Sequence, residues 1–183
     1  MPIRMPLSVN QARLANEVKD KFLRVLVAHG ETVVTMTELA SKSPEPGVRR
    51  LFERLGQAGR DVYLLQGVGL INVHVRSKPP GWWNIQKSVK TDLDDLHEAL
   101  SIDRAFVLLI GRKDEFIADG YIATDFEHPP FVRPPGEEAT KYSINEKQDL
   151  DQAFLFLSLD KVAEVLLTKF RLPKAVANAS RVR

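Results

Sequence analysis

The sequence predicts a mixed α/β fold, in which helices flank a central, mixed and partly antiparallel β-sheet. Three observations lead to this prediction. Apolar residues recur at helical spacing near both ends of the chain, as at Leu14, Val18 and Phe22. Between these ends lie several short runs of β-branched and apolar residues. Some of these runs are joined directly by glycine turns, and such hairpin connections make at least part of a sheet antiparallel.

The first part of the chain is expected to be mainly helical. Ser8 can cap a first helix, with Gln11 as its capping-box partner, and His29-Gly30 ends that helix. Residues 32–35 are typical of a short strand, and a helical turn over 37–40 follows. The prolines and the glycine of residues 43–47 predict a chain break. After the break, apolar residues on one face predict a second helix that Gly56 and Gly59 close.

The central part is expected to supply most of the sheet, with strands over 62–65, 70–77 and 82–85. A helix over 92–100 carries leucines on one face, and strands over 105–110 and 115–122 form a hairpin. Four prolines predict a loop over 128–136. The remaining elements are a strand over 140–144 and a C-terminal helix with an apolar stripe from Leu159 to Phe170.

Size and composition suit one soluble domain, because 44% of the 183 residues are hydrophobic and 27% are charged. We expect an α/β domain over 1–172 and a basic tail over 173–183. No apolar run is long enough for a membrane helix, and no apolar signal core follows Met1, so we expect a cytoplasmic protein. The lack of cysteine excludes disulfides, thiol catalysis and cysteine-based metal sites.

Charge is unevenly distributed, although the net charge is only +2. Residues 62–91 contain no Asp or Glu but four basic residues: Arg76, Lys78, Lys87 and Lys90. A basic segment that also carries tryptophans is typical of a nucleic-acid-binding surface. Ordinary mixing of surface charges produces similar patterns, so the segment alone does not decide the function.

Strand alternation divides residues 70–78 into two faces. Ile71, Val73 and Val75 point one way, into the core. The other face carries a polar and basic row: Asn72, His74, Arg76 and Lys78. Because burying such a row is costly, we expect this face to line a groove. The alternative is an exposed edge strand whose charges prevent aggregation.

This layout resembles the PD-(D/E)XK nuclease superfamily, in its Mrr-like and Holliday-resolvase-like branch. Its members run from a helix with a Glu to a strand that starts with Asp, and then to a strand that ends in (Glu or Gln)-x-Lys. Here Asp61 follows Gly59-Arg60, and Val73-His74-Val75-Arg76-Ser77 stands where the family has Val-Gln-Val-Lys-Ser. Residues 82–85 fit the aromatic strand that follows, and Glu17 fits the helical Glu. The distinctive part covers residues 59–85, within a resemblance over 17–126.

The resemblance implies a restriction-endonuclease-like fold and a metal-dependent site, in which acids bind Mg²⁺ and the lysine activates water. It makes Glu17, Asp61, His74 and Arg76 the candidate catalytic residues, with Asp61 as the metal ligand. Two positions depart from the pattern. Histidine is a poor Mg²⁺ ligand because this ion prefers oxygen. Arginine stays charged and cannot serve as a tuneable base, although it can hold a phosphate.

We therefore expect a DNA-binding, nuclease-like domain that is catalytically weak or inactive, in the defence or repair context that the resemblance implies. The expected nucleic-acid contacts are Arg76, Lys78, Trp82, Lys87 and Lys90. Trp82 and Trp83 point to opposite faces, so one of them is expected in the core. The other can stack on a base or pack against protein, and the two lysines of the helix entry can simply be solvated.

Two alternatives remain open. An active Mg²⁺- or Mn²⁺-dependent deoxyribonuclease would use Glu17, Asp61 and a further carboxylate in a rearranged site. A protein-interaction subunit with no nucleic-acid role would account for the near-neutral net charge and the acidic stretches. We expect no membrane contact, and the sequence leaves the oligomeric state open between a homodimer and a larger complex.

Overall fold

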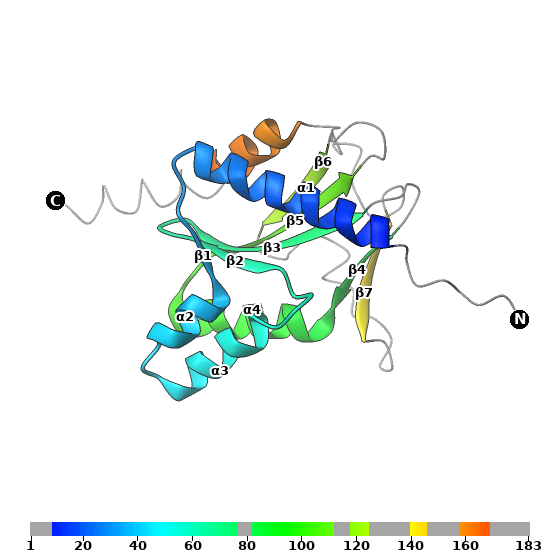
Figure 1. Cartoon of the computed structure of the whole chain (residues 1–183). Coiled ribbons are helices and arrows are strands. Elements are labelled where there is room, and N and C mark those ends of the chain that lie inside the picture. Colours follow the sequence, from blue (N-terminus) through cyan, green and yellow to red (C-terminus); the bar gives the residue numbers. More distant parts are fainter. Residues whose placement is uncertain (1–8, 77–81, 112–117, 125–139, 146–157, 169–183) are drawn as a thin grey trace, which may run out of the picture.

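A computed structural model describes residues 9–76, 82–111, 118–124, 140–145 and 158–168. These residues form three layers (Figure 1), with a five-stranded sheet in the middle. One face of the sheet is covered by α1 (Val9–Ala28) and by a helical segment over 159–168. The other face is covered by three helices: α2 (Met36–Lys42), α3 (Pro46–Leu55) and α4 (Lys87–Leu100). The predicted mixed α/β class is confirmed.

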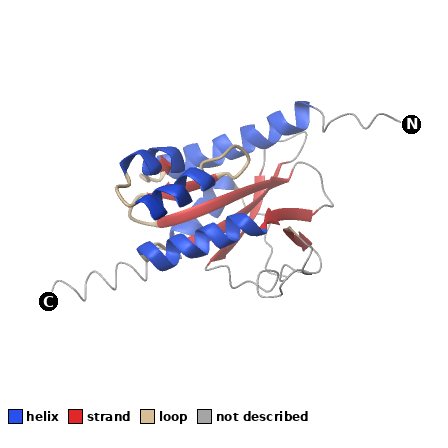
Figure 2. Ribbon diagram, turned by 90° about the horizontal axis from the view of Figure 1, so that it is seen from below, coloured by secondary structure: helices blue, strands red, loops and turns tan. Residues whose placement is uncertain are grey.

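The sheet is mixed, as the sequence predicts. Its strands are β1 (Val33–Thr35), β2 (Val62–Leu65), β3 (Gly69–Arg76), β5 (Arg104–Gly111) and β6 (Ala118–Thr124), in that order across the sheet. The pair β3–β5 is parallel, because α4 crosses over between the two strands. The other neighbours are antiparallel, and Val62 lies opposite Asn72. Figure 2 views the molecule from below, with helices in front of the sheet and behind it.

The strand that follows β3 in the chain leaves the central sheet. This strand, β4 (Trp82–Gln86), pairs with β7 (Lys141–Asn145) in a separate two-stranded ribbon. Trp83 and Ile85 alternate inward from the ribbon and are buried, together with Ile144 of β7. The ribbon therefore extends the cover of the same sheet face as α4.

Each face of the sheet has its own hydrophobic core. Toward α1 the core contains Phe22, Ile71 and Val107, and toward α4 it contains Leu70, Phe106 and Leu93. The alternation along β3 and β5 accounts for both cores, because successive side chains point to opposite faces. Gly69 marks a close approach between the two strands: a Cβ there would lie 2.7 Å from the backbone oxygen of Asp103.

Two helices begin at residues other than those the sequence predicts. Helix α3 begins at Pro46, inside the predicted break, because the Glu45 carboxylate accepts hydrogen bonds from the N–H groups of Gly47 and Val48, at 2.9 and 2.7 Å. Helix α4 begins at residue 87 rather than 92, since buried Val89 extends its apolar stripe by one turn. Of the predicted strand over 115–122, residues 118–122 lie in β6, and residues 115–117 lie outside the described residues.

Several predicted features lie outside the described residues: Ser8, Lys78, the loop over 128–136 and the tail over 173–183. The side chain of Trp82 also lies outside them. No helix in the described ranges is long and apolar enough to cross a membrane.

Candidate functional site

Asp61 lies just before β2, in a backbone conformation that few residues adopt. Its φ is 50°, in the left-handed region where aspartate is tolerated better than most residues, and Gly59 before it has φ 83°. The Asp61 carbonyl accepts a hydrogen bond from the Val73 N–H at 2.9 Å, which ties the start of β2 to β3. The fold therefore fixes the position from which the Asp61 carboxylate projects.

The charged partner of Asp61 is Lys19 of α1, a residue that the sequence analysis did not single out. Lys19 Nζ lies 2.8 Å from Asp61 Oδ1, and the Lys19 side chain is only 17% exposed. Burial acts to lower the pKa of Lys19, but the hydrogen bond and charge of Asp61, with help from Tyr63 and Asp20, outweigh it and raise that pKa. The pair is therefore an ammonium–carboxylate pair at neutral pH. The sequence signal for this partner is the position of Lys19, directly after Val18 of the buried helical stripe.

Glu17, the predicted helical acid, takes a different partner. Its carboxylate lies 3.5 Å from Arg13 Nε, one turn earlier on α1. Successive residues of a helix are about 100° apart, so Glu17 and Lys19 project from opposite flanks of the buried Val18. Helix α1 thus presents a lysine to Asp61 where the resemblance leads one to expect a glutamate.

Asn72 and His74 form a polar pair on the α4 face of β3. The Asn72 amide nitrogen donates to the backbone carbonyls of Arg60 and Asp61, at 2.7 and 3.3 Å. Its Oδ1 must therefore face His74, and His74 Nε2 donates to this oxygen. This arrangement requires the proton of a neutral imidazole to sit on Nε2 and leaves Nδ1 as an acceptor.

His74 is kept neutral by its surroundings. Burial lowers its pKa to about 4, although the negative charge of Asp61 acts in the opposite direction. The ring also packs against Phe106, with 5.9 Å between ring centroids. At neutral pH this histidine can accept or donate hydrogen bonds but carries no charge.

Arg76 lies inside the fold rather than on an open groove. Only 7% of the residue is exposed, and its guanidinium lies 4.1 Å from the centroid of the Trp83 ring, in a cation–π contact. The expectation that the polar face of β3 lines a groove is wrong for Asn72 and Arg76, which are both buried. Helix α4 and the β4–β7 ribbon cover this face, where Asn72 donates hydrogen bonds to backbone carbonyls and Arg76 packs against Trp83. Trp83 is the tryptophan that enters the core, as predicted for one of the two.

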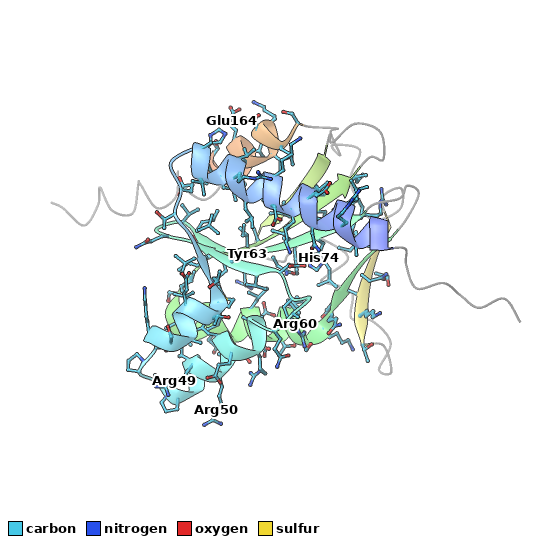
Figure 3. The ribbon with its side chains drawn as sticks, in the orientation of Figure 1. Arg49, Arg50, Arg60, Tyr63, His74 and Glu164 are labelled. Atoms are coloured by element: carbon cyan, nitrogen blue, oxygen red, sulfur yellow. The ribbon has the colours of Figure 1, made fainter. Side chains whose placement is uncertain are left out.

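The two predicted lysines of α4 have different surroundings. Lys90 Nζ lies 2.6 Å from Asp94, which also accepts a hydrogen bond from Arg104 at 2.9 Å. Lys87 is the first residue of α4 and is partly exposed. Arg60, which is not among the predicted contacts, donates from Nη1 to Ser88 Oγ at 2.6 Å. Figure 3 shows Arg60 and His74, which come from the start of β2 and the end of β3.

A cleft of about 420 Å³ opens beside Asp61, where β1 gives way to α2. Its lining includes the Lys19–Asp61 pair and Tyr63, which is labelled in Figure 3. Burial raises the pKa of Tyr63, so its phenol stays protonated. The loop over 56–59 forms another wall.

The described residues do not fit a divalent metal site. Nowhere among them do three His, Asp or Glu side chains come close enough to hold a metal ion. The Asp61 carboxylate is bound to an ammonium group instead. Mg²⁺ requires several oxygen ligands at short distance, and His74 offers only a ring nitrogen.

Comparison with known proteins gives no independent indication of function, since no protein-family model matches the chain and no curated protein matches its sequence.

Proposed function

We propose that this chain is a nuclease-like domain that binds DNA and lacks metal-dependent cleavage. The Lys19–Asp61 ion pair is the single observation that carries the proposal. Asp61 occupies the position at which the PD-(D/E)XK resemblance expects a metal-binding carboxylate. An ammonium group 2.8 Å away neutralises that carboxylate, as a bound cation would.

The other residues that metal-dependent cleavage would need also bind partners within the fold. Mg²⁺ would have to displace a largely buried ammonium and then find further oxygen ligands. His74 uses Nε2 to bind Asn72, and Arg76 stacks on Trp83. Arginine cannot give up a proton near neutral pH, so it cannot replace the lysine that activates water. These contacts favour a binding role over catalysis.

The same ion pair favours contact with DNA phosphates. A lone carboxylate beside the strand start would repel a phosphate, and Lys19 removes that charge. Arg60 and Lys87 stand at the entry of α4, where Arg60 reaches Ser88. We therefore assign the phosphate contacts to Arg60 and Lys87. Arg76 and Lys90 become structural, because each is held by a partner inside the fold.

Binding is tested by fluorescence anisotropy with a labelled duplex over a series of salt concentrations. We expect the logarithm of the affinity to fall linearly with the logarithm of the salt concentration, by ~0.9 per phosphate contact. The Arg60→Gln/Lys87→Gln double variant should weaken binding and lower this slope by about 2. Lys42→Gln, which removes an exposed cation of α2, is the matched control and should leave the slope unchanged.

Cleavage is tested by incubating supercoiled plasmid with Mg²⁺ or Mn²⁺. We expect no nicking by the wild type. Metal-dependent nicking that disappears in Asp61→Asn would reject the inactive site and favour a rearranged nuclease. Lack of DNA binding even at low salt would reject the DNA-binding role and favour the protein-interaction alternative.

A further inference from the structure

The cleft beside Asp61 exists because β2 loses its neighbour there. Strand β1 pairs with β2 only as far as Thr35, opposite Tyr63, and then the chain turns into α2. The capping box of Thr35 and Glu38 fixes this turn. The resulting space of about 420 Å³ lies within the range of roughly 300–1,000 Å³ that is typical of small-molecule sites.

The lining of the cleft combines fixed polar groups with an aromatic ring. Asp61 supplies a hydrogen-bond acceptor, and Lys19 lies 2.8 Å from it as a donor. Gln57 and Thr37 add an amide and a hydroxyl, and the partly buried ring of Tyr63 forms part of a wall. The charges of Lys19 and Asp61 cancel, so the lining does not select for an isolated anion or cation.

We propose that this cleft accepts one unpaired nucleobase of the bound DNA, an inference that rests on the proposed function. The edge of a nucleobase carries donors and acceptors side by side, which matches the neighbouring acceptor and donor of Asp61 and Lys19. The flat face of a base can stack on Tyr63. Arg60, between the lining residues Gly59 and Asp61, would hold a phosphate of the same strand.

The test compares a labelled duplex that contains one extrahelical base with the same duplex fully paired. We expect the wild type to bind the duplex with the extrahelical base about tenfold more tightly, which corresponds to one stacked base. Tyr63→Phe should keep this preference, because the ring remains. Tyr63→Leu should abolish the preference while binding to the paired duplex persists.

A second variant addresses the cleft without touching the packed Tyr63. Ala58→Trp, in the loop that lines the cleft, should fill the space and also abolish the preference. Ala99→Trp, at an exposed alanine of α4 outside this cleft, is the matched control and should retain it.

The outcomes separate this inference from the proposed function. Equal binding of both duplexes by the wild type would overturn the nucleobase site and leave DNA binding intact. A preference that survives both Tyr63→Leu and Ala58→Trp would likewise overturn the site. Failure to bind either duplex at low salt would overturn both proposals.

Discussion

Asn72 and His74 show how one amide sets the tautomer of a neighbouring imidazole. Asn72 directs its nitrogen to two backbone carbonyls, so only its oxygen is left to face His74. The imidazole must then donate from Nε2. A second proton would give the ring a positive charge between the sheet and the layer that covers its α4 face. Burial opposes this charge and lowers the pKa of His74 to about 4.

His74 should make the fold sensitive to acid. Its pKa falls from 6.5 in the unfolded chain to about 4 in the folded protein, so its contribution to stability is complete above pH 6.5. That contribution is lost as the pH falls from 6.5 through 4, and it is on the order of 3 kcal/mol. His74→Gln, whose amide can still donate to Asn72, should remove this part of the acid sensitivity. Urea unfolding at a series of pH values measures it.

The control for this experiment is His29→Gln, which removes a histidine from the exposed end of α1. Carboxylates also contribute to acid unfolding, and the difference between variants cancels their share. If the wild type and His74→Gln lost stability in parallel between pH 6.5 and 4, His74 would not be the group responsible.

At the scale of elements, an ion pair with a buried carboxylate joins α3 to α4. Arg54 donates to both carboxylate oxygens of Asp92 through Nε and Nη2, at 3.0–3.3 Å. The Asp92 side chain is only 10% exposed, whereas that of Arg54 is 50% exposed. Asp92 therefore depends on Arg54 to compensate its lost hydration, while Arg54 keeps contact with water.

Arg54→Ala should lower the free energy of unfolding by about 2 kcal/mol, since it leaves the Asp92 carboxylate buried without its partner. The value is at the lower end for buried pairs because water can reach the vacated, half-exposed position. Arg50→Ala, an exposed position on the same helix, should change stability by less than ~0.5 kcal/mol. Urea unfolding of the three proteins measures the difference, and equal effects of the two substitutions would show that the ion pair does not join the helices.

At the scale of the whole molecule, the packing of α1 against the sheet gives Asp61 its charged partner. This packing brings Lys19 to Asp61 across 42 residues of sequence. The ammonium group of Lys19 thereby neutralises the Asp61 carboxylate just before β2. A ligand that binds only the folded state raises its melting temperature, so metal binding can be measured directly.

We expect millimolar Mg²⁺ or Mn²⁺ to leave the melting temperature of the wild type unchanged, because the Asp61 carboxylate is already neutralised. Lys19→Gln should melt at a lower temperature, since it leaves Asp61 without a cation. Thermal unfolding with and without metal measures both effects. If the melting temperature of the wild type rose with metal concentration to a plateau, and Asp61→Asn abolished this rise, Asp61 would be a metal ligand and the proposed loss of the metal site would be wrong.

The amino-acid sequence alone predicts the features that depend on local periodicity. The alternation of Ile71 and Val73 with Asn72 and His74 could be predicted, because strand side chains alternate wherever the strand pairs. The long apolar stripe of α1 and the β5–β6 hairpin were predictable for the same reason, since each follows from neighbouring residues. These patterns fix which side chains share a face, and with them the mixed α/β class.

Tertiary packing determines which helix or strand covers each face of the sheet. It also determines which distant residues come into contact. Lys19 rather than Glu17 faces Asp61, because the docking of α1 selects one flank of the helix. Arg76 is buried against Trp83, because β4 leaves the sheet and folds over the end of β3. These contacts join segments that are distant in sequence, and their geometry depends on how whole elements pack, which no local period encodes.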